Sequence, residues 1–445
     1  MDSCCLLELI ETTHAWVWGP WMLVLIISIG LAVHFTLGLD LFRQLVPSFK
    51  ILLRSRQETA SGQVSPFRAL VTTLAATIGT GSIAGVATAI ATGGPGALFW
   101  MWIAGLVGMA TKFAEAALAV EYRVIDSRGE YLGGPMFYIS RGLGPKFIWM
   151  GTLYAALAAF TSFGLGNIVQ ANAVAQIMSG TFSIPHWLTG GILAVLVASV
   201  ILGGLNRVAK IAETIVPVMA IGYVLASLSF LLIHFKELPA VFSSIFHYAW
   251  APTPAIGGFM GASVASAMRM GIARGIFANE AGLGSGAISH AAAKTSNPVN
   301  QGLVAMWGTI IDTLIICNMS GLILITSGKW NSGLSGACLT AEAFNTTFSF
   351  GSELVALCLL LFSFTTILGW GFYGERCFQY LFGEKSVKLY RWLWIFALPL
   401  GATVQMTLVW LGSDIMNALM AIPNLIALFL LLPKLQKLYR SKKAV

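Results

Sequence analysis

Two apolar, membrane-length segments about two hundred residues apart are each interrupted by glycine near the middle. The first interruption covers residues 75–85 (AATIGTGSIAG) and the second covers residues 277–286 (FANEAGLGSG). Glycine costs about 1 kcal/mol relative to alanine inside a helix, so neither stretch suits a regular helix. Inside a bilayer, unpaired backbone survives only where protein buries it or where it lines a cavity. The two segments therefore predict a pair of discontinuous membrane helices, an arrangement typical of the binding sites of secondary transporters.

The composition favours a membrane setting, with 57% hydrophobic and only 10% charged residues, against about 25% charged residues in soluble domains. Apolar runs of about 20 residues predict eleven membrane spans. Their approximate limits are 15–38, 66–92, 95–120, 147–178, 187–205, 209–235, 255–292, 299–326, 351–381, 389–411 and 413–434.

The excess of basic residues reflects membrane topology rather than nucleic-acid binding. With the N-terminus outside and the C-terminus in the cytoplasm, most of the 26 lysines and arginines fall in cytoplasmic loops or in the C-terminal tail. The opposite orientation would invert this asymmetry, which is the one that the positive-inside rule describes. We expect a multi-pass protein of the plasma (inner) membrane, in contact with the lipid bilayer and not with nucleic acid. The six cysteines lack C-x-x-C spacing, which argues against a disulfide framework or a zinc site.

The positions of the breaks predict the organisation of the chain. If residues 1–45 form a peripheral N-terminal helix, ten core spans remain, and the breaks fall in the first and the sixth of them. We therefore expect an all-α integral membrane fold with about 11 transmembrane helices. Five plus five of them would form an inverted repeat with one discontinuous helix in each half. We expect residues 1–445 to form a single membrane transporter domain, with the first repeat at 66–235 and the second at 255–435.

Breaking a helix at mid-membrane exposes two half-helix ends with opposite preferences. The N-terminal ends favour an anion, whereas the C-terminal ends and unwound carbonyls offer oxygen to a cation. A zwitterion of amino-acid size, accompanied by Na⁺, would use both. Close helix packing through Gly81 and Gly85 is the alternative, but Asn279 and Glu280 in the second break are not needed for packing.

Two further spans carry polar residues suited to such a site. Thr365 and Thr366 offer hydroxyl oxygens to a hard cation, unless they only bond carbonyls of their own helix. Trp370 lies one turn further on and would close over a small substrate or belong to an aromatic belt. Asn167 and Gln170 share a helix face, either as ligands of a charged substrate or as interhelical contacts.

Four acids fall most clearly inside the predicted spans: Glu115, Glu213, Glu280 and Asp312. Intramembrane acids are functional candidates by default. Lys112 lies three residues before Glu115, so a local ion pair would make Glu115 structural.

At these motifs the chain resembles the sodium:alanine/glycine symporter family, whose members have a leucine-transporter-type fold. The resemblance covers residues 66 to 435. It is carried by GTG at 79–81, GGPG at 93–96, FWMW at 99–102, GMATKFAE at 108–115, GGPM at 133–136, NIVQAN at 167–172, ARG at 273–275, NEAGLGS at 279–285, HAAA at 290–293, ILGW at 367–370 and YGE at 373–375. Ser82 stands where the family usually has asparagine, and Ala287 stands where proline is more typical.

The resemblance implies Na⁺-driven uptake of alanine or glycine by alternating access. The backbone near Thr80 and Gly81 would receive the substrate carboxylate, and the pocket would be shaped by Gln170, Phe277, Asn279 and Trp370. It also implies that Na⁺ is held by the carbonyls of Ala75 and Ile78 together with Thr365 and Thr366. The resemblance thus implies Na⁺ as the coupling ion, and we expect no cofactor.

Three alternatives remain. A proton-coupled or exchange-type amino-acid carrier of the same fold would differ in its Na⁺ dependence. A channel would need a continuous pore, whereas breaks at mid-membrane favour a closed site. An enzyme is disfavoured because no nucleophile–base or metal constellation is present in the sequence.

Overall fold

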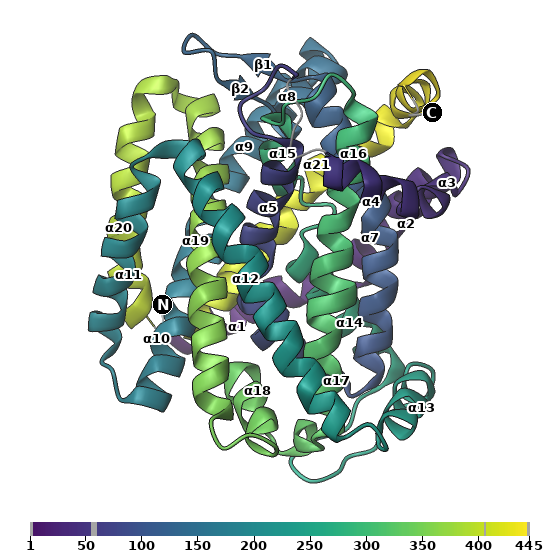
Figure 1. Cartoon of the computed structure of the whole chain (residues 1–445), viewed down its shortest axis with the longest axis vertical. Coiled ribbons are helices and arrows are strands. Elements are labelled where there is room, and N and C mark those ends of the chain that lie inside the picture. Colours follow the sequence, from purple (N-terminus) through teal and green to yellow (C-terminus); the bar gives the residue numbers. More distant parts are fainter. Residues whose placement is uncertain (1–2, 55–59, 405, 443–445) are drawn as a thin grey trace.

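The computed structural model describes residues 3–54, 60–404 and 406–442, and most of them are helical. Figure 1 shows helices running along the long axis, with a short hairpin of β1 (Val124–Ile125) and β2 (Tyr131–Leu132) at one end. The two strands are antiparallel and pair Val124 with Leu132. The helices α13 (Leu238–Tyr248) and α18 (Gly336–Asn345) lie at the opposite end.

The remaining helices follow the chain order. In the first half they are α1 (Ser3–Val17), α2 (Pro20–Thr36), α3 (Asp40–Arg43), α4 (Leu45–Arg54), α5 (Pro66–Thr77), α6 (Val86–Gly93), α7 (Gly96–Glu121), α8 (Pro135–Phe137), α9 (Ile148–Thr161), α10 (Val169–Phe182), α11 (His186–Ile201) and α12 (Gly204–Ile233). In the second half they are α14 (Val264–Asn279), α15 (Ser285–Ala291), α16 (Pro298–Thr309), α17 (Asn318–Thr326), α19 (Gly351–Phe382), α20 (Val387–Thr403) and α21 (Met406–Lys442).

Seven helical stretches of the described chain are long and apolar enough to cross a membrane. They are Glu8–Thr36, Gly96–Glu121, Pro145–Phe182, Gly204–Ile233, Pro298–Thr326, Gly351–Phe382 and Val409–Ser441. An eighth is the broken pair Pro66–Thr77 and Gly81–Gly93, which is bent by 55°. The mostly helical membrane architecture is thus confirmed, but the count of eleven spans is not.

The difference in count lies in three predicted spans that form shorter helices. The helices α11 and α14 have 16 residues each, and α20 has 17, whereas about 20 residues span the hydrocarbon core. The helix α14 stops at the second break, and α15 continues beyond it. The arrangement of five plus five helices in an inverted repeat stays a prediction.

Local sequence explains where the helices that carry the breaks begin. The hydroxyl of Ser65 accepts a hydrogen bond from the Arg68 amide, and Pro66 takes the first position of α5. Ser263 caps α14 in the same way by accepting from the Ser266 amide. Such caps satisfy backbone donors that a helix start leaves unpaired. Each broken segment therefore begins at a capped position, and it ends at a non-glycine residue, Ile78 after α5 and Glu280 after α14.

Three π-helical turns interrupt the spans of the described chain, namely η2 (Gly81–Gly85), η5 (Ser162–Ile168) and η6 (Ile310–Cys317), and a further one, η3 (Tyr138–Gly142), lies between two spans. Short 3₁₀ turns form at η4 (Pro145–Phe147), η7 (Lys329–Asn331) and η8 (Glu384–Ser386). The turns η2 and η6 pack against each other, and η5 packs against α19. Because π turns are frequent at functional sites, their position beside the first break directs attention to the centre of the molecule.

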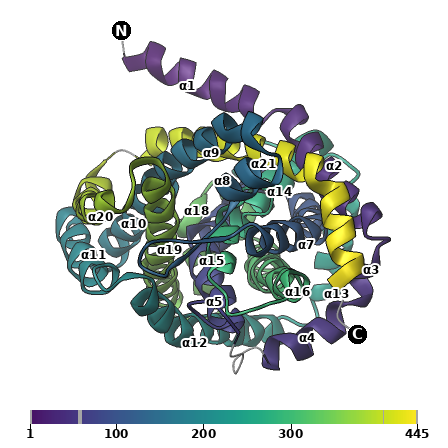
Figure 2. The ribbon, with the colours of Figure 1, turned by 90° about the horizontal axis from the view of Figure 1, so that it is seen from above.

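Viewed from above, α5 and α15 lie near the middle of the bundle, close to α16, while α1 runs along its outside (Figure 2). The helix α2 packs against α7 and α21, and α1 packs against α21. The N-terminal segment therefore covers one side of the bundle, and both of its first two helices contact α21.

Candidate functional site

The first break is a short extended connection between two helices. The helix α5 ends at Thr77, and Ile78 turns the backbone into an extended conformation with φ −75° and ψ 90°. The chain becomes helical again with the π turn that starts at Gly81. The carbonyls at the end of α5 and the amides at the start of η2 therefore meet at the centre of the bundle.

The second break uses left-handed backbone. Glu280 has φ 56°, followed by Gly282 at 89° and Gly284 at 75°. Glycine adopts these angles without strain, whereas a non-glycine residue rarely does. The buried Glu280 accepts a hydrogen bond from the Ser285 hydroxyl at 2.6 Å, which ties the two ends of the break together.

Glu115 of α7 holds the second break from outside. Its Oε1 accepts from the amides of Gly282 and Gly284, each at 3.0 Å, and from Asn424 Nδ2 at 2.8 Å. Asn424 of α21 also donates to the Gly282 carbonyl at 2.9 Å. Glu115 is therefore structural, as expected, but through a different contact. The expected ion pair is absent, since Lys112 Nζ lies more than 4.0 Å from its carboxylate and makes no hydrogen bond.

A small cavity lies between the first break and α19. It is lined by Ala76, Thr77, Gly79, Gly81, Leu165, Gln170, Phe277, Glu280, Thr366 and Trp370. Four of the residues expected at the substrate site, Gly81, Gln170, Phe277 and Trp370, thus line one space. Its volume of about 10 Å³ is close to that of a single water, so the cavity is closed around a space too small for an amino acid.

Gln170 connects the cavity to the first break. Its Oε1 accepts from the Thr80 amide at 3.3 Å, and its Nε2 donates to the Thr80 hydroxyl at 3.0 Å. Asn167, by contrast, donates to the Trp394 carbonyl and acts as an interhelical contact. Asn279 does not line this cavity: its Nδ2 donates to Thr313 Oγ1, and its Oδ1 accepts from the Ala281 amide.

Three of the four residues expected to bind a cation lie together. The Thr366 hydroxyl donates to the Ala75 carbonyl at 3.1 Å and to the Ile78 carbonyl at 3.3 Å. The Thr365 hydroxyl donates instead to the Phe362 carbonyl at 3.0 Å and lies 3.6 Å from the sulfur of Met219. Oxygen ligands of this kind suit a hard cation, and the structure brings Thr366 but not Thr365 to them.

Trp370 is fully buried, so it does not face lipid as an aromatic belt residue would. It packs edge-to-face on Tyr373 with 5.7 Å between ring centroids. A Cβ on Gly166 of η5 would lie 2.2 Å from the Trp370 Cβ, so the two backbones can approach only because residue 166 has no side chain. Trp370 is therefore fixed against η5 as one wall of the cavity.

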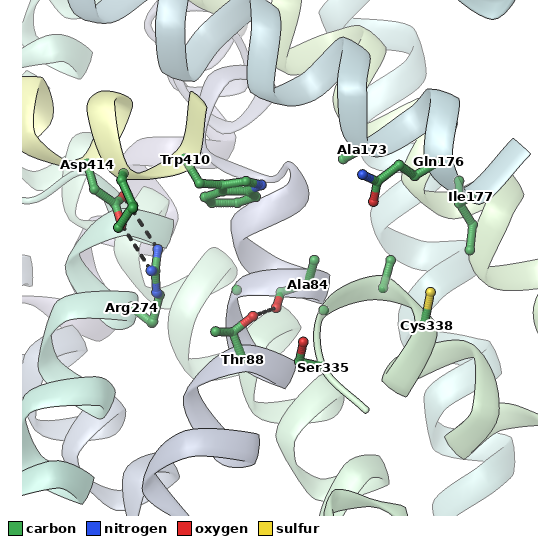
Figure 3. Close-up of a pocket in the computed structure, with 14 residues that line it drawn as sticks. Ala84, Thr88, Ala173, Gln176, Ile177, Arg274, Ser335, Cys338, Trp410 and Asp414 are labelled. Carbon is green, nitrogen blue, oxygen red and sulfur yellow. Dashed lines mark hydrogen bonds and ion pairs between the residues drawn. The ribbon is translucent and has the colours of Figure 1, made fainter. Parts of the chain in front are cut away.

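A second, larger cavity of about 440 Å³ lies on the side of the first break that faces α18 (Figure 3). We call it the vestibule. It is lined by Ala84, Gly85, Thr88, Ala173, Gln176, Ile177, Arg274, Ser335, Gly336, Ala337, Cys338, Trp410, Leu411 and Asp414. Its size is that of cavities that bind small molecules.

A stack of aromatic and charged groups separates the vestibule from the small cavity. Phe277, which lines the small cavity, stacks on Trp410, which lines the vestibule, with 5.5 Å between centroids. The Arg274 guanidinium lies within 6 Å of both rings and donates to Asp414 at 3.0 Å. We call Arg274, Phe277, Trp410 and Asp414 the gate, because together they lie between the residues that line the two cavities.

The N-terminal helices reach this gate. His14 Nε2 lies 3.2 Å from Asp414 Oδ2, and the Trp18 indole donates to the Asp414 carbonyl at 3.0 Å. Sequence reasoning found neither contact, because the partners are about 400 residues apart. The one signal available for the ion pair with Arg274 was Asp414 itself, an acid at the edge of an apolar run.

Comparison with known proteins identifies the family to which the chain is similar. Residues 4–443 match the model of the sodium:alanine symporter family. The chain is 43% identical to the sodium/alanine symporter AgcS of Methanococcus maripaludis over 95% of this chain and 94% of that protein. It is 38% identical to the probable sodium/glutamine symporter GlnT of Bacillus subtilis over 96% of this chain and 89% of that protein.

A solved structure supports the fold. The structure of MhsT in complex with L-phenylalanine superposes with a TM-score of 0.61 at 12% identity, covering 83% of this chain and 89% of that one. At this identity the likeness concerns the fold alone. The likeness to a leucine-transporter-type fold agrees with the expected fold class, whereas the inverted repeat stays a prediction.

Proposed function

Because this chain belongs to the sodium:alanine symporter family, we propose that it imports a small neutral amino acid, alanine or glycine, together with Na⁺. Amino-acid transport itself follows from the family and from the relatives. The observation that carries the finer proposal is the first break, where the amide of Thr80 and the carbonyls of Ala75 and Ile78 meet one buried hydroxyl and one buried amide side chain.

The break offers both halves of a zwitterion site. The amides at the start of η2, near Thr80 and Gly81, present the positive end of a helix to a carboxylate. Gln170 already bonds the Thr80 amide and can exchange that bond for one to a substrate. The expected roles of Phe277 and Trp370 rest on their place in the cavity wall. Asn279 would reach the substrate only after releasing Thr313.

The cation would sit beside the substrate. The Thr366 hydroxyl lies within hydrogen-bond distance of the Ala75 and Ile78 carbonyls, which gives three oxygen ligands, and Thr365 would complete the set by rotating away from Phe362. Sodium would then stabilise the bent backbone of the first break. Since the same backbone forms the substrate cavity, ion binding and substrate binding would favour each other.

The closed cavity and the closed gate fit alternating access. In this state the substrate site holds room for about one water, while the vestibule is open on the far side of the gate. The positive-inside pattern would place the vestibule outside the cell and the β1–β2 hairpin inside it. Import then requires the gate to open outward and the α5–α15 side to open inward.

The test is uptake of labelled alanine by purified protein in liposomes, with and without an inward Na⁺ gradient. We expect accumulation at least several-fold higher with the gradient, and competition by glycine. Equal accumulation with potassium or choline in place of sodium would replace the symporter with the proton-coupled or exchange-type carrier. Flux that does not saturate with alanine concentration would indicate a channel.

A further inference from the structure

Asp312 lies at the centre of the molecule without a charged partner. It is fully buried in the π turn η6. Its Oδ1 accepts from the Ser82 hydroxyl at 2.6 Å, and its Oδ2 accepts from the Thr313 hydroxyl at 3.3 Å. The Cys317 thiol lies at 3.9–4.0 Å from the two oxygens. Within the described chain, no lysine, arginine or histidine nitrogen comes within 4.0 Å of this carboxylate.

The contacts of Asp312 link it to both breaks. Ser82 belongs to η2, directly after the first break, and its carbonyl accepts from Ser320 of α17 at 2.7 Å. Thr313 accepts from Asn279, the last residue of α14 before the second break. A movement of either broken helix therefore changes what surrounds the carboxylate.

The charged groups around η6 do not balance Asp312. Among the titratable groups on the elements packed against it, Lys112 of α7 attracts the carboxylate from more than 4.0 Å, and Glu280 of the second break repels it. Tyr223 of α12 bonds Ser320, and Cys317 is a neutral thiol neighbour. An isolated ionised carboxylate in a dry interior is costly and is usually neutralised by a proton or by a bound cation.

We propose that Asp312 is a proton-binding site and that each transport cycle carries one proton into the cell in addition to the amino acid and Na⁺. This inference rests on the proposed function, since it adds a second coupling ion to that transport. In the closed state described above, the carboxyl group holds the proton and is neutral. When the inner side opens, the O–H bond of the acid breaks, the proton passes to water, and the carboxylate is protonated again from the outer side.

The chemistry of the neighbours favours a proton over a second metal ion. The groups that face the carboxylate are two hydroxyls and a thiol, while the Asn279 amide turns its N–H toward Thr313 and its oxygen toward Ala281. A hard cation prefers several oxygen ligands, and the sulfur of Cys317 is a poor one. A hydroxyl can accept as well as donate, so Ser82 can hold either the acid or the carboxylate at the same distance.

The experiment uses the full chain in liposomes that contain a pH-sensitive dye. Alanine is added outside, with Na⁺ present, and internal acidification and labelled alanine uptake are recorded in parallel from about pH 5.5 to about pH 8.5, a range that brackets neutrality. The variant Asp312→Asn mimics the neutral acid but cannot release a proton. Glu213→Gln is the matched control, because Glu213 is a partly exposed acid of α12 paired with Arg68, outside the site.

We expect alanine-dependent acidification in the unmodified protein and in Glu213→Gln, and its loss in Asp312→Asn. Na⁺-driven uptake should persist in Asp312→Asn with a pH profile that has become flat. Ser82→Ala removes the donor that stabilises the carboxylate, and should move the midpoint of the pH profile to higher pH by about one unit.

The outcomes separate the two proposals. Uptake of alanine with Na⁺ but without acidification in the unmodified protein would overturn the proton site and leave the symporter intact. Acidification that persists in Asp312→Asn would overturn the assignment to this residue. Loss of Na⁺ dependence in that variant would make Asp312 a sodium ligand instead. If Asp312→Asn fails to fold, an unchanged pH profile in Ser82→Ala would overturn the proposal, and absence of any amino-acid uptake would overturn the proposed function itself.

Discussion

Both breaks leave backbone amides and carbonyls without partners in their own helix, and the two breaks pair these groups in different ways. The first break contains no charged residue. Its Thr80 amide bonds the Gln170 side chain, and its Ala75 and Ile78 carbonyls bond the Thr366 hydroxyl. These two side chains could give up their bonds so that the backbone groups bind a ligand. The second is held by Glu115 and Asn424, whose hydrogen bonds end on its own amides and carbonyl. The comparison teaches that two broken helices can be held in different ways: the proposed ion ligands lie at the first break, whereas hydrogen bonds from α7 and α21 fix the backbone of the second.

The largest effect is expected for Glu115→Ala, which tests whether this carboxylate holds the second break. It leaves the amides of Gly282 and Gly284 and the Asn424 side chain without their acceptor, and losing one partner of a buried charged network costs about 3–5 kcal/mol. We expect a large loss of thermal stability and of folded protein, measured by thermal unfolding and size exclusion in detergent. Glu115→Gln keeps one oxygen acceptor and should be milder. Wild-type stability in Glu115→Ala would mean that the second break does not depend on this carboxylate.

The complementary test is Thr366→Val, which keeps the shape of the side chain and removes its oxygen. We expect normal folding, and a Na⁺ concentration for half-maximal uptake raised about tenfold or more, which corresponds to at least about 1.4 kcal/mol of lost ion binding. Alanine affinity at saturating Na⁺ should change less. Thr365→Val should have the smaller effect, because its hydroxyl points to Phe362. Unaltered Na⁺ dependence in both variants would remove the threonines from the ion site.

Substrate size provides a third test of the first break. The cavity wall formed by Trp370 and the unwound backbone is tight, so alanine, glycine and serine should compete for uptake while leucine should not. Trp370→Ala should admit leucine and weaken alanine binding; a methylene in an apolar pocket is worth about 1–3 kcal/mol. Competition by alanine, valine and leucine against labelled alanine measures the effect in both proteins. Good competition by leucine in the unmodified protein would show that Trp370 does not limit the pocket.

The smallest expected effect concerns the gate. His14→Ala removes one of the side chains that contact Asp414 but leaves the bond to Arg274. Exposed pairs contribute about 0.2–1 kcal/mol, so we expect uptake rates to change by no more than about fivefold, without a change in Na⁺ dependence. Arg274→Ala leaves Asp414 without its main partner and serves as the large reference effect. Equal losses in both variants would mean that α1 contributes as much to the gate as Arg274.

The sequence was sufficient to place both breaks, because glycine and polar residues in the middle of an apolar run are costly in an unbroken membrane helix. It also placed Thr366 beside Ala75 and Ile78 through a family resemblance. Long-range partners were out of reach: Glu115 binds Asn424, which is 309 residues away, and the nearby Lys112 was the only partner that helical spacing could suggest. Whether a hydroxyl faces one helix or another, as for Thr365 and Thr366, depends on packing that spacing alone does not encode.

The lengths of the membrane helices were also poorly predicted from the sequence. Hydropathy marked the segments at 187–205 and 389–411, but it could not locate the ends of the helices that form there. The helix α11 begins directly after Pro185, and α20 has Pro399 close to its C-terminal end at Thr403. Proline restricts the backbone and removes a donor, so helix ends respond to single residues while an averaged hydropathy window does not.

The π turn η2 has a mechanical consequence for the first break. A π turn holds one more residue than the α-helical path between the same two ends. Returning that residue to α-helical winding would turn the following helix, α6, by about 100° around its axis and shift it by about 1.5 Å. The extra residue in η2 therefore allows α6 to rotate, and it lies between the proposed ion site and the wall of the vestibule. A cation that fixes the first break would thereby set the angle at which α6 presents its side chains to the outer cavity.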